Sequence, residues 1–298
     1  MTVEISNPDK VLFPDAGLTK ADLADYYERV AERMLPYVRD RPVSMHRFPD
    51  GVDAEGFFHK DVPDHFPDWI KRVRVRKQDG SLTHAVVSDS KALVYLADQA
   101  CITPHVWLSR ADSLERPDRM AFDLDPAGNG FASVCRVARA LGELLDELEL
   151  AHFAMTTGSR GIHVWVPLKR RHDFGYVRSF ARDVAGVMEV RHPDLVTTQQ
   201  RKRKRGQRIL VDVMRNSYAQ TAVPPYAVRP RGKAPVATPL RWEELSSSRL
   251  RPDRWTVRNL FRRLAGREDP WRGMDSQART LTRARDRLDR LADAGSGA

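Results

Sequence analysis

Between residues 120 and 214 the hydrophobic positions follow two different periods. Apolar residues recur at every second position in segments 120–125, 152–157, 162–168 and 208–214, and at helical spacing in segments 134–148 and 174–187. The order strand, helix, strand, strand, helix, strand is the split βαβ arrangement. Its first and second strands leave room for the third strand between them. The predicted spatial order of the four strands is therefore 4-1-3-2.

Shorter patterns before residue 120 predict further elements. Thr19 to Asp22 resembles a helix-capping box and is followed by apolar residues at helical spacing, which predicts a helix over about 20–37. The stretch "VRVRKQDGSLTHAVV" alternates on both sides of Asp79-Gly80, a pair typical of a hairpin turn. Another helix is predicted near 90–100. The expected fold class is α+β, with an N-terminal α/β portion in addition to the split βαβ sheet.

The segment "FDLDP", residues 122–126, carries two carboxylates inside an apolar strand. Because side chains alternate along a strand, Asp123 and Asp125 share the face opposite Phe122 and Leu124. A solvated strand edge would explain two acids, but Asp212 on the fourth strand is expected on the same face of the neighbouring strand. Three carboxylates on adjacent strands favour a divalent-metal site. We therefore predict that these three aspartates are catalytic and bind metal.

The loop "TTGSRGIH" joins the second and third predicted strands. Ser159 and Arg160 can donate to phosphate oxygens, and the glycines let backbone amides approach an anion, although a plain hairpin loop is the alternative. His163 is a candidate nucleotide contact or a hydrogen-bonded sheet histidine. Further candidate nucleotide contacts, expected at the same end of the sheet, are Arg205, Arg215 and Arg229. Acids flanked by such cations suit two-metal phosphoryl transfer to or from a triphosphate.

The net charge of the chain indicates a polyanionic partner. The 298 residues have a formal net charge of +10 and a pI of about 9.8, which favours nucleic acid as the partner. The strongest basic run is residues 201–205, which indicates either phosphate contact, a solvated loop or a targeting-type peptide.

Cysteine usage and hydropathy argue against several other classes of protein. Cys101 and Cys135 lie far apart and outside any C-x-x-C motif, so we expect two small core residues and neither a disulfide framework nor a thiolate zinc site. Apolar runs are too short for a membrane span, and the first residues lack the basic and apolar regions of a signal peptide. The expected location is the cytoplasm, without a membrane partner.

Taken together, these motifs resemble the polymerase domain of bacterial DNA ligase D, in the archaeo-eukaryotic primase superfamily. The matching segments, in order, are "NPDKVLFP", "GLTKADLADYY", "RPVSMHRFPDGV", "GFFHK", "FDLDP", "TTGSRGIHVWVPL", "ILVDVMRN", "AVPPYAVRPR", "PLRWEEL", "WTVRNLFRRL" and "DPWRGM". The resemblance implies a primase-type fold for residues 1–275, with the catalytic core at about 119–215. Residues 276–298 are expected to form a charged helical tail with a flexible end.

The resemblance also implies an activity. The family fills short gaps at DNA breaks with a template-dependent polymerase that often prefers ribonucleotides and favours manganese, with magnesium possible. The implied substrates are nucleoside and deoxynucleoside triphosphates, and the implied partners are DNA with gaps, breaks or 3′ overhangs and a 5′-phosphate. An end-joining ligase and end-binding proteins are further implied partners, in non-homologous end joining.

Residue by residue, the resemblance assigns several contacts. Asp123, Asp125 and Asp212 match the metal-binding acids, and Ser159, Arg160, His163 and Arg229 match nucleotide contacts, with arginine at 160 where the family commonly has lysine. Phe57 and Phe58 match an aromatic pair that packs on the template, and Lys10 and Lys20 match lysines that hold a 5′-phosphate. Without the family, the two phenylalanines would be interpreted as largely core and the two lysines as ordinary surface residues.

Three rival interpretations stay open at this point. Lys77 in "KQDG" matches the short K-x-D-G signature of ligases that adenylate themselves, although the flanking alternation indicates a simple hairpin. A non-catalytic DNA-end-binding protein would keep the basic surface but would not need all three acids. A metal-dependent nuclease could use the same acids without the nucleotide-binding loop.

Overall fold

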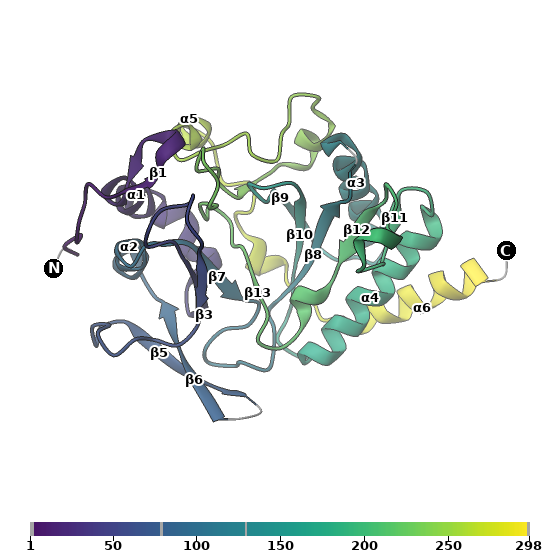
Figure 1. The fold of residues 1–298 in the computed structure, drawn as a ribbon. Coiled ribbons are helices and arrows are strands. Elements are labelled where there is room, and N and C mark those ends of the chain that lie inside the picture. Colours follow the sequence, from purple (N-terminus) through teal and green to yellow (C-terminus); the bar gives the residue numbers. More distant parts are fainter. Residues whose placement is uncertain (1–2, 78–79, 129, 297–298) are drawn as a thin grey trace. The chain divides into compact units, whose positions relative to one another are not determined.

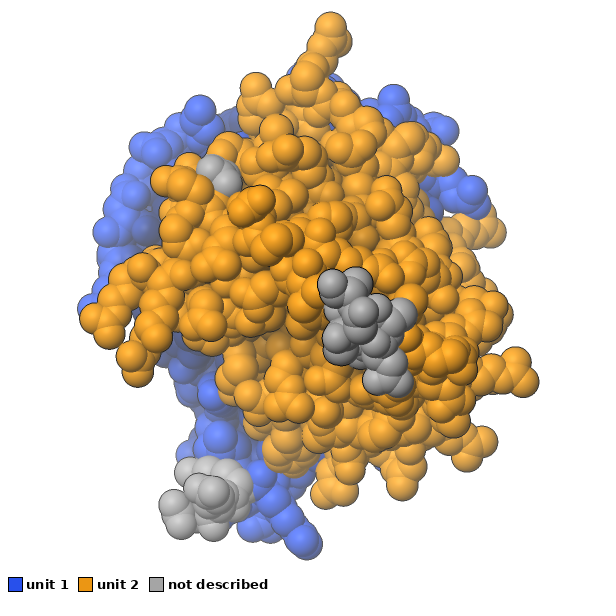
Figure 2. Space-filling model, turned by 90° about the vertical axis from the view of Figure 1, so that its right-hand side faces the viewer, with its two compact units in different colours: residues 1–114, 221–238, 253–269 blue, residues 115–220, 239–252, 270–298 orange. Residues whose placement is uncertain are grey.

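The computed structural model describes residues 3–77, 80–128 and 130–296, which form two compact units (Figures 1 and 2). The first unit comprises residues 1–114, 221–238 and 253–269, and the second comprises residues 115–220, 239–252 and 270–298. The predicted division into a polymerase domain at residues 1–275 and a helical tail at residues 276–298 stays a prediction. Among the described residues, no helix combines the length and the apolar character needed to cross a membrane.

The described residues of the first unit form three helices, one 3-10 helix and eight strands. Its helical elements are α1 (Lys20–Val38), α2 (Ser90–Asp98), α5 (Leu260–Leu264) and the 3-10 helix η1 (Pro14–Ala16). Its strands are β1 (Val11–Phe13), β2 (Leu18–Thr19), β3 (Arg41–Arg47), β4 (Phe57–His59), β5 (Lys71–Lys77), β6 (Gly80–Val87), β7 (Cys101–Trp107) and β13 (Thr221–Ala222).

Helix α1 begins and ends close to where the sequence pattern predicts. The Thr19 hydroxyl accepts a hydrogen bond from the Asp22 amide at 3.2 Å, and the Asp22 carboxylate accepts one from the Thr19 amide at 2.8 Å. This reciprocal pair satisfies amide groups that the first helical turn leaves open. The stripe that contains Tyr26, Val30 and Met34 is buried, so the helix is stabilised mainly by its apolar face.

The main sheet of the first unit has the order β13-β7-β3-β6-β5, with β4 paired to the free part of β3. Strands β5 and β6 are antiparallel along their whole length, with Val75 opposite Leu82, which confirms the predicted hairpin strands. The turn residues Gln78 and Asp79 lie outside the described residues. The predicted helix near 90–100 is α2, whose first turn is capped by the Asp89 side chain.

The second unit contains the split βαβ core. Its helical elements are α3 (Phe131–Glu147), α4 (Phe174–Arg191), α6 (Thr282–Ser296), η2 (Lys202–Lys204), η3 (Met214–Asn216), η4 (Trp242–Ser246) and η5 (Met274–Gln277). Its strands are β8 (Arg119–Pro126), β9 (Phe153–Thr156), β10 (Ile162–Pro167), β11 (Val196–Thr197) and β12 (Ile209–Asp212), and the chain passes between the units at β14 (Thr238–Pro239).

The strand order of this sheet is β11-β12-β8-β10-β9-β14. The predicted first to fourth strands are β8, β9, β10 and β12, so the observed order is 4-1-3-2 and the prediction is confirmed, as is the α+β class. Helices α3 and α4 both pack on β8. They cover the face that carries Phe122 and Leu124, which are fully buried, while Asp123 and Asp125 on the other face are only half-buried.

Helix α3 begins without a side-chain cap. Ser133 has a side chain suited to N-capping, but the helix begins at Phe131 and its N-cap is Gly130, which has no side chain to donate or accept a cap bond. The Ser133 hydroxyl instead accepts a hydrogen bond from Arg136 at 3.2 Å. Capping preference is a weak local signal, and burial of the Val134–Leu145 stripe decides where the helix lies.

Both cysteines are buried free thiols, as predicted. Burial raises the pKa of Cys101 to about 12 and that of Cys135 to about 11, because the thiolate loses its hydration in the core. We expect neither thiol to react with iodoacetamide at pH 8 in the folded protein, whereas both react in denaturant. Intact mass measured before and after unfolding checks this, and a rapid single alkylation of the native chain would contradict it.

Candidate active site

Strands β8 and β12 bring the three predicted acids to one face of the sheet. Asp212 lies directly opposite Asp123 in the antiparallel register, and Asp125 follows two residues along β8. Opposed residues have Cβ atoms about 4.5–5.5 Å apart, so these carboxylates share one site. Strand β10 adds His163, which is opposite Asp123 on the other side of β8. The sheet register therefore confirms the predicted juxtaposition.

Asp123 is held by two cationic or polar neighbours. His163 Nε2 lies 3.4 Å from Asp123 Oδ2, and Arg215 Nε on η3 lies 4.0 Å from the same oxygen. His163 is only 4% exposed, and its Nδ1 is buried without a hydrogen-bond partner among the described residues. Nε2 is therefore the ring nitrogen placed to donate to the Asp123 carboxylate.

Asp125 is held by two arginines. Arg205 Nη1 donates to Asp125 Oδ2 at 3.2 Å, and Arg160 Nη2 donates to Asp125 Oδ1 at 3.4 Å. Arg205 is only 5% exposed and donates two further hydrogen bonds to the carbonyl groups of Gln199 and Gln200, at 3.0 and 2.7 Å. Arg205 therefore fixes its own loop to β8, whereas Arg160 is exposed and its side chain can reach other anions.

Asp212 is oriented by its own chain neighbours. Its Oδ1 accepts a hydrogen bond from the Met214 amide at 2.9 Å and another from Gln200 Nε2 at 3.3 Å. Asn216 Oδ1 accepts a hydrogen bond from the Ala121 amide at 2.8 Å, and Asn216 Nδ2 donates one to the Ala121 carbonyl at 2.7 Å. These two bonds fix η3 to β8. Sequence reasoning missed Gln200 and Asn216, because only the folded register shows that they support the acids.

The loop that carries Ser159 and Arg160 is closed by Thr157. The Thr157 hydroxyl oxygen lies 3.2 Å from the amides of both Ser159 and Gly161, so these two amides are already bonded within the loop. This differs from the expectation that they approach an anion. Gly158 adopts a positive φ of 66°, which few other residues adopt without strain. The Ser159 and Arg160 side chains remain the groups of this loop that are suited to phosphate.

Gly161 allows this loop to pass against β8. A Cβ at this position would lie 2.2 Å from the Leu124 carbonyl oxygen, so Gly161→Ala must displace either the loop or the strand that carries Asp123 and Asp125. We expect a loss of about 1–3 kcal/mol of stability. Gly186 of α4 is the matched control, because a Cβ there meets nothing within 4 Å.

In the interior of a helix, Gly186→Ala should stabilise by about 0.5–1 kcal/mol. Urea unfolding of both variants gives the comparison. Equal stability of Gly161→Ala and the unchanged protein would mean that the loop does not need its close approach to β8.

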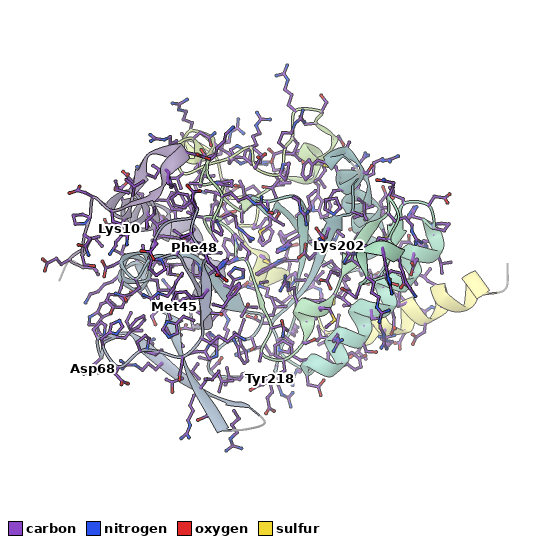
Figure 3. All side chains as sticks on the ribbon, viewed as in Figure 1. Lys10, Met45, Phe48, Asp68, Lys202 and Tyr218 are labelled. Atoms are coloured by element: carbon purple, nitrogen blue, oxygen red, sulfur yellow. The ribbon has the colours of Figure 1, made fainter. Side chains whose placement is uncertain are left out.

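The basic run at residues 201–205 divides into two parts. Residues 201–204 are exposed on and before η2, and Lys202 is labelled in Figure 3. Their loop is fixed at its base by Glu189, whose carboxylate accepts hydrogen bonds from Thr197 and Thr198 at 3.1 and 2.7 Å. Four cations therefore stand on an anchored loop and remain available to a polyanion, while Arg205 belongs to the acid site.

The first unit holds the two predicted phosphate-binding lysines in different surroundings. Lys10 is exposed and pairs with Asp50 at 3.1 Å (Figure 3). Lys20 is 6% exposed, and its ammonium donates to Ser6 Oγ at 2.9 Å and to Asp98 Oδ1 at 3.3 Å. The interpretation of Lys20 as an ordinary surface residue is wrong.

The helix N-terminus next to these lysines is closed rather than open. The amides of Lys20 and Ala21 donate to the carbonyls of Lys10 and Pro8, at 2.9 and 3.0 Å, and Thr19 accepts from the third amide. These three amides of the α1 N-terminus are therefore already bonded within the protein and are not free to bind a phosphate.

Phe57 and Phe58 are both exposed, at 46% and 53%. The core interpretation is therefore wrong: within the described residues β4 pairs with β3 alone, and both rings keep a large exposed surface. Arg229 lies in the first unit, in the loop after β13, where its amide donates to the Pro235 carbonyl at 2.7 Å. Lys77 ends β5, and the side-chain environment of the "KQDG" stretch lies outside the described residues.

Three carboxylates on adjacent strands are the donor set that hard divalent cations prefer. Across residues 3–77, 80–128 and 130–296, however, no three histidine, cysteine or acidic side chains are drawn together as a preformed metal centre. The oxygens of Asp123, Asp125 and Asp212 face the protein's own donors instead. The three aspartates have the right chemistry and the right positions in the sheet for a divalent metal. To bind it, their oxygens must give up their present bonds to protein donors.

The family model for the LigD primase-polymerase domain matches residues 19–271. The chain belongs to the LigD primase-polymerase family. It is 34% identical over 252 residues to the multifunctional non-homologous end joining protein LigD of Mycolicibacterium smegmatis. The matched region covers 84% of this chain and 33% of that protein. The LigD of Pseudomonas aeruginosa is 34% identical over 273 residues, covering 90% of this chain and 32% of that protein.

A solved structure has the same fold. The polymerase domain of Mycobacterium tuberculosis ligase D in complex with DNA superposes with a TM-score of 0.87 at 34% identity, covering 93% of this chain and 99% of that one. The resemblance, the primase-type fold and the enzyme class, a nucleotidyltransferase of the primase-polymerase type, are thereby confirmed. This LigD-type chain spans about a third of the length of the two curated relatives.

Proposed function

We propose that the chain is a template-dependent polymerase that adds nucleotides at DNA breaks and short gaps in non-homologous end joining. The observation that carries the proposal is the in-register set of Asp123, Asp125 and Asp212 on the open face of the split βαβ sheet. A binding protein would not need three carboxylates gathered among arginines, since like charges repel.

The three aspartates would hold the divalent metal ions. Bound there, the ions supply charge neutralisation at the triphosphate and a lower pKa for the attacking 3′-hydroxyl. The protein contributes placement. Asp123 and Asp212 are fixed by paired strands, and Ser159 and Arg160 would donate to the nucleotide. His163, opposite Asp123 on β10, would be a further nucleotide contact. Arg215, which lies beside Asp123, would add charge to triphosphate binding.

The DNA is bound by cations and aromatic rings elsewhere on the chain. The exposed cations of residues 201–204 suit the phosphate backbone, and exposed Phe57 and Phe58 suit unpaired template bases, since stacking tolerates any base. The structural relative with DNA supports this choice of partner. An end-joining ligase and end-binding proteins would be the further partners.

Substrate and metal preference are the finer part of the proposal. We expect ribonucleotides to be favoured over deoxynucleotides and manganese over magnesium, and the protein to act in the cytoplasm. Extension of a primer on gapped DNA, with both sugars and both metals compared, tests these preferences together. Extension without a template, or equal use of all four nucleotides opposite one template base, would contradict template dependence.

Recognition of the 5′-phosphate gives a separate prediction. Lys10 is exposed and can exchange Asp50 for a phosphate, so gapped DNA with a downstream 5′-phosphate should bind about tenfold more tightly than DNA with a 5′-hydroxyl. Lys10→Ala should remove most of that preference while extension of simple primers remains. Titration of both DNAs with both proteins closes a thermodynamic cycle. A preference that survives in Lys10→Ala would exclude this lysine as the phosphate contact.

A further inference from the structure

The strand pair β3–β4 carries two exposed rings, and each ring has a partner on β3. In the antiparallel register, His46 is opposite Phe58 and Arg47 is opposite Phe57. Opposed residues project to the same side of a sheet, so each phenylalanine lies against the β3 side chain facing it. The Arg47 guanidinium lies 5.6 Å from the centre of the Phe57 ring.

The contact between His46 and Phe58 is a parallel stack. The ring centres are 4.2 Å apart and the planes differ by 7°. His105 meets the Phe58 ring edge-on, at 5.1 Å and 75°. Phe58 nevertheless stays 53% exposed. One face of its ring is therefore covered by imidazole, one edge touches His105, and the other face is open.

His46 is itself held in place from below. The buried Phe48 ring lies 4.6 Å from the imidazole at 57°. Phe48 fits there because residue 56 is glycine, since a Cβ at Gly56 would lie 2.3 Å from the Phe48 ring. The layers Phe48, His46 and Phe58 thus rise from the core to the surface.

His46 contributes to this stack as a neutral ring. Burial, together with the nearby positive charge of Arg229, lowers its pKa to about 4. Its Nδ1 is buried without a hydrogen-bond partner in the part of the chain that the structure describes. Protonation would place an unsatisfied N–H there, so the imidazole stays uncharged at neutral pH.

We propose that His46 is a positioning residue which holds the Phe58 ring flat, so that its open face receives an unpaired nucleobase of the DNA template strand as the outer layer of the stack. The inference rests on the proposed function for its ligand. A flat, neutral support fixes the plane of the outer ring without competing for the base, and a ring that is already immobilised loses less entropy on binding. The stack tolerates any base, because every base has a π-face.

The experiment uses the full chain and gapped DNA with 2-aminopurine at the first unpaired template position, without metal or nucleotide. Stacking on Phe58 quenches the fluorescence of this base. We expect Phe58→Ala to abolish the quenching, and His46→Leu, which fills space without a flat ring, to weaken binding about five- to tenfold and to reduce quenching. His46→Phe should restore both, and His65→Leu, at an exposed histidine, is the control that should change neither.

Quenching and affinity that are unchanged in His46→Leu, with Phe58→Ala defective, would overturn the proposal. If thermal melting shows His46→Leu to be unfolded, His46→Gln replaces it with the same expected loss. Quenching and affinity in His46→Phe as low as in His46→Leu would also overturn it. Because this readout needs no catalysis, it is separate from primer extension by the unchanged protein, whose absence would instead remove the proposed polymerase function.

Discussion

Asp123→Asn should reduce nucleotide addition by at least about a hundredfold while DNA affinity stays within a factor of two or so, because the change removes one charge at the site of phosphoryl transfer and leaves the basic surface intact. Asparagine keeps the shape of the side chain and can still accept a hydrogen bond from His163, so the fold should be preserved. Asp212→Asn should behave in the same way, since Asp212 lies opposite Asp123 in the register.

The matched control is Asp194→Asn, an exposed acid of the same unit, which should leave the rate unchanged. Asp125 is a less clean test, because its loss also deprives buried Arg205 of its carboxylate partner and costs stability. Single-turnover extension and a DNA titration on each variant measure the two quantities. Near-normal extension by Asp123→Asn would remove this carboxylate from the mechanism.

Lys20→Ala should destabilise the protein by about 3–5 kcal/mol, because it leaves the buried carboxylate of Asp98 without its cation. The Asp98 carboxylate also accepts hydrogen bonds from the amide and hydroxyl of Ser6, both at 2.8 Å, so this ion pair holds the N-terminal segment against α1 and α2. Lys10→Ala is the matched control. Its exposed pair with Asp50 should contribute less than about 1 kcal/mol.

Urea unfolding of both lysine variants and of Lys20→Met combined with Asp98→Leu tests the explanation. The double variant should recover much of the loss, because it removes both charges together. A Lys20→Ala protein as stable as Lys10→Ala would show that the pair does not stabilise the fold. It would also favour Lys20 as a phosphate ligand, a role that its contacts with Ser6 and Asp98 restrict.

The split βαβ core could be predicted because the hydrophobic patterns that specify its strands and helices are local in the sequence. Periods of two and 3.6 identify its strands and helices, and the steric rules of the motif then give the order 4-1-3-2 that β12, β8, β10 and β9 adopt. The shared face of the three aspartates follows from that order. The family resemblance supplied the enzyme class, which spacing alone could not reach.

Features that depend on tertiary context could not be predicted. Arg205 ends a run of five basic residues, and nothing local indicates that it alone is buried against Asp125. Lys20 looks like an ordinary helix-start lysine until α2 brings Asp98 to it. The exposure of both Phe57 and Phe58 depends on β4 pairing with β3 alone. His46 could have been noticed only by knowing the register that places it opposite Phe58.

Single-nucleotide addition to gapped DNA tests the central claim most directly. The unchanged protein, with manganese or magnesium, should add the nucleotide complementary to the first template base much faster than any other, and changing that base should change the preferred nucleotide. EDTA should stop the reaction, and Asp123→Asn should lack it. Addition that ignores the template base, or that continues in EDTA, would contradict a metal-dependent, templated polymerase.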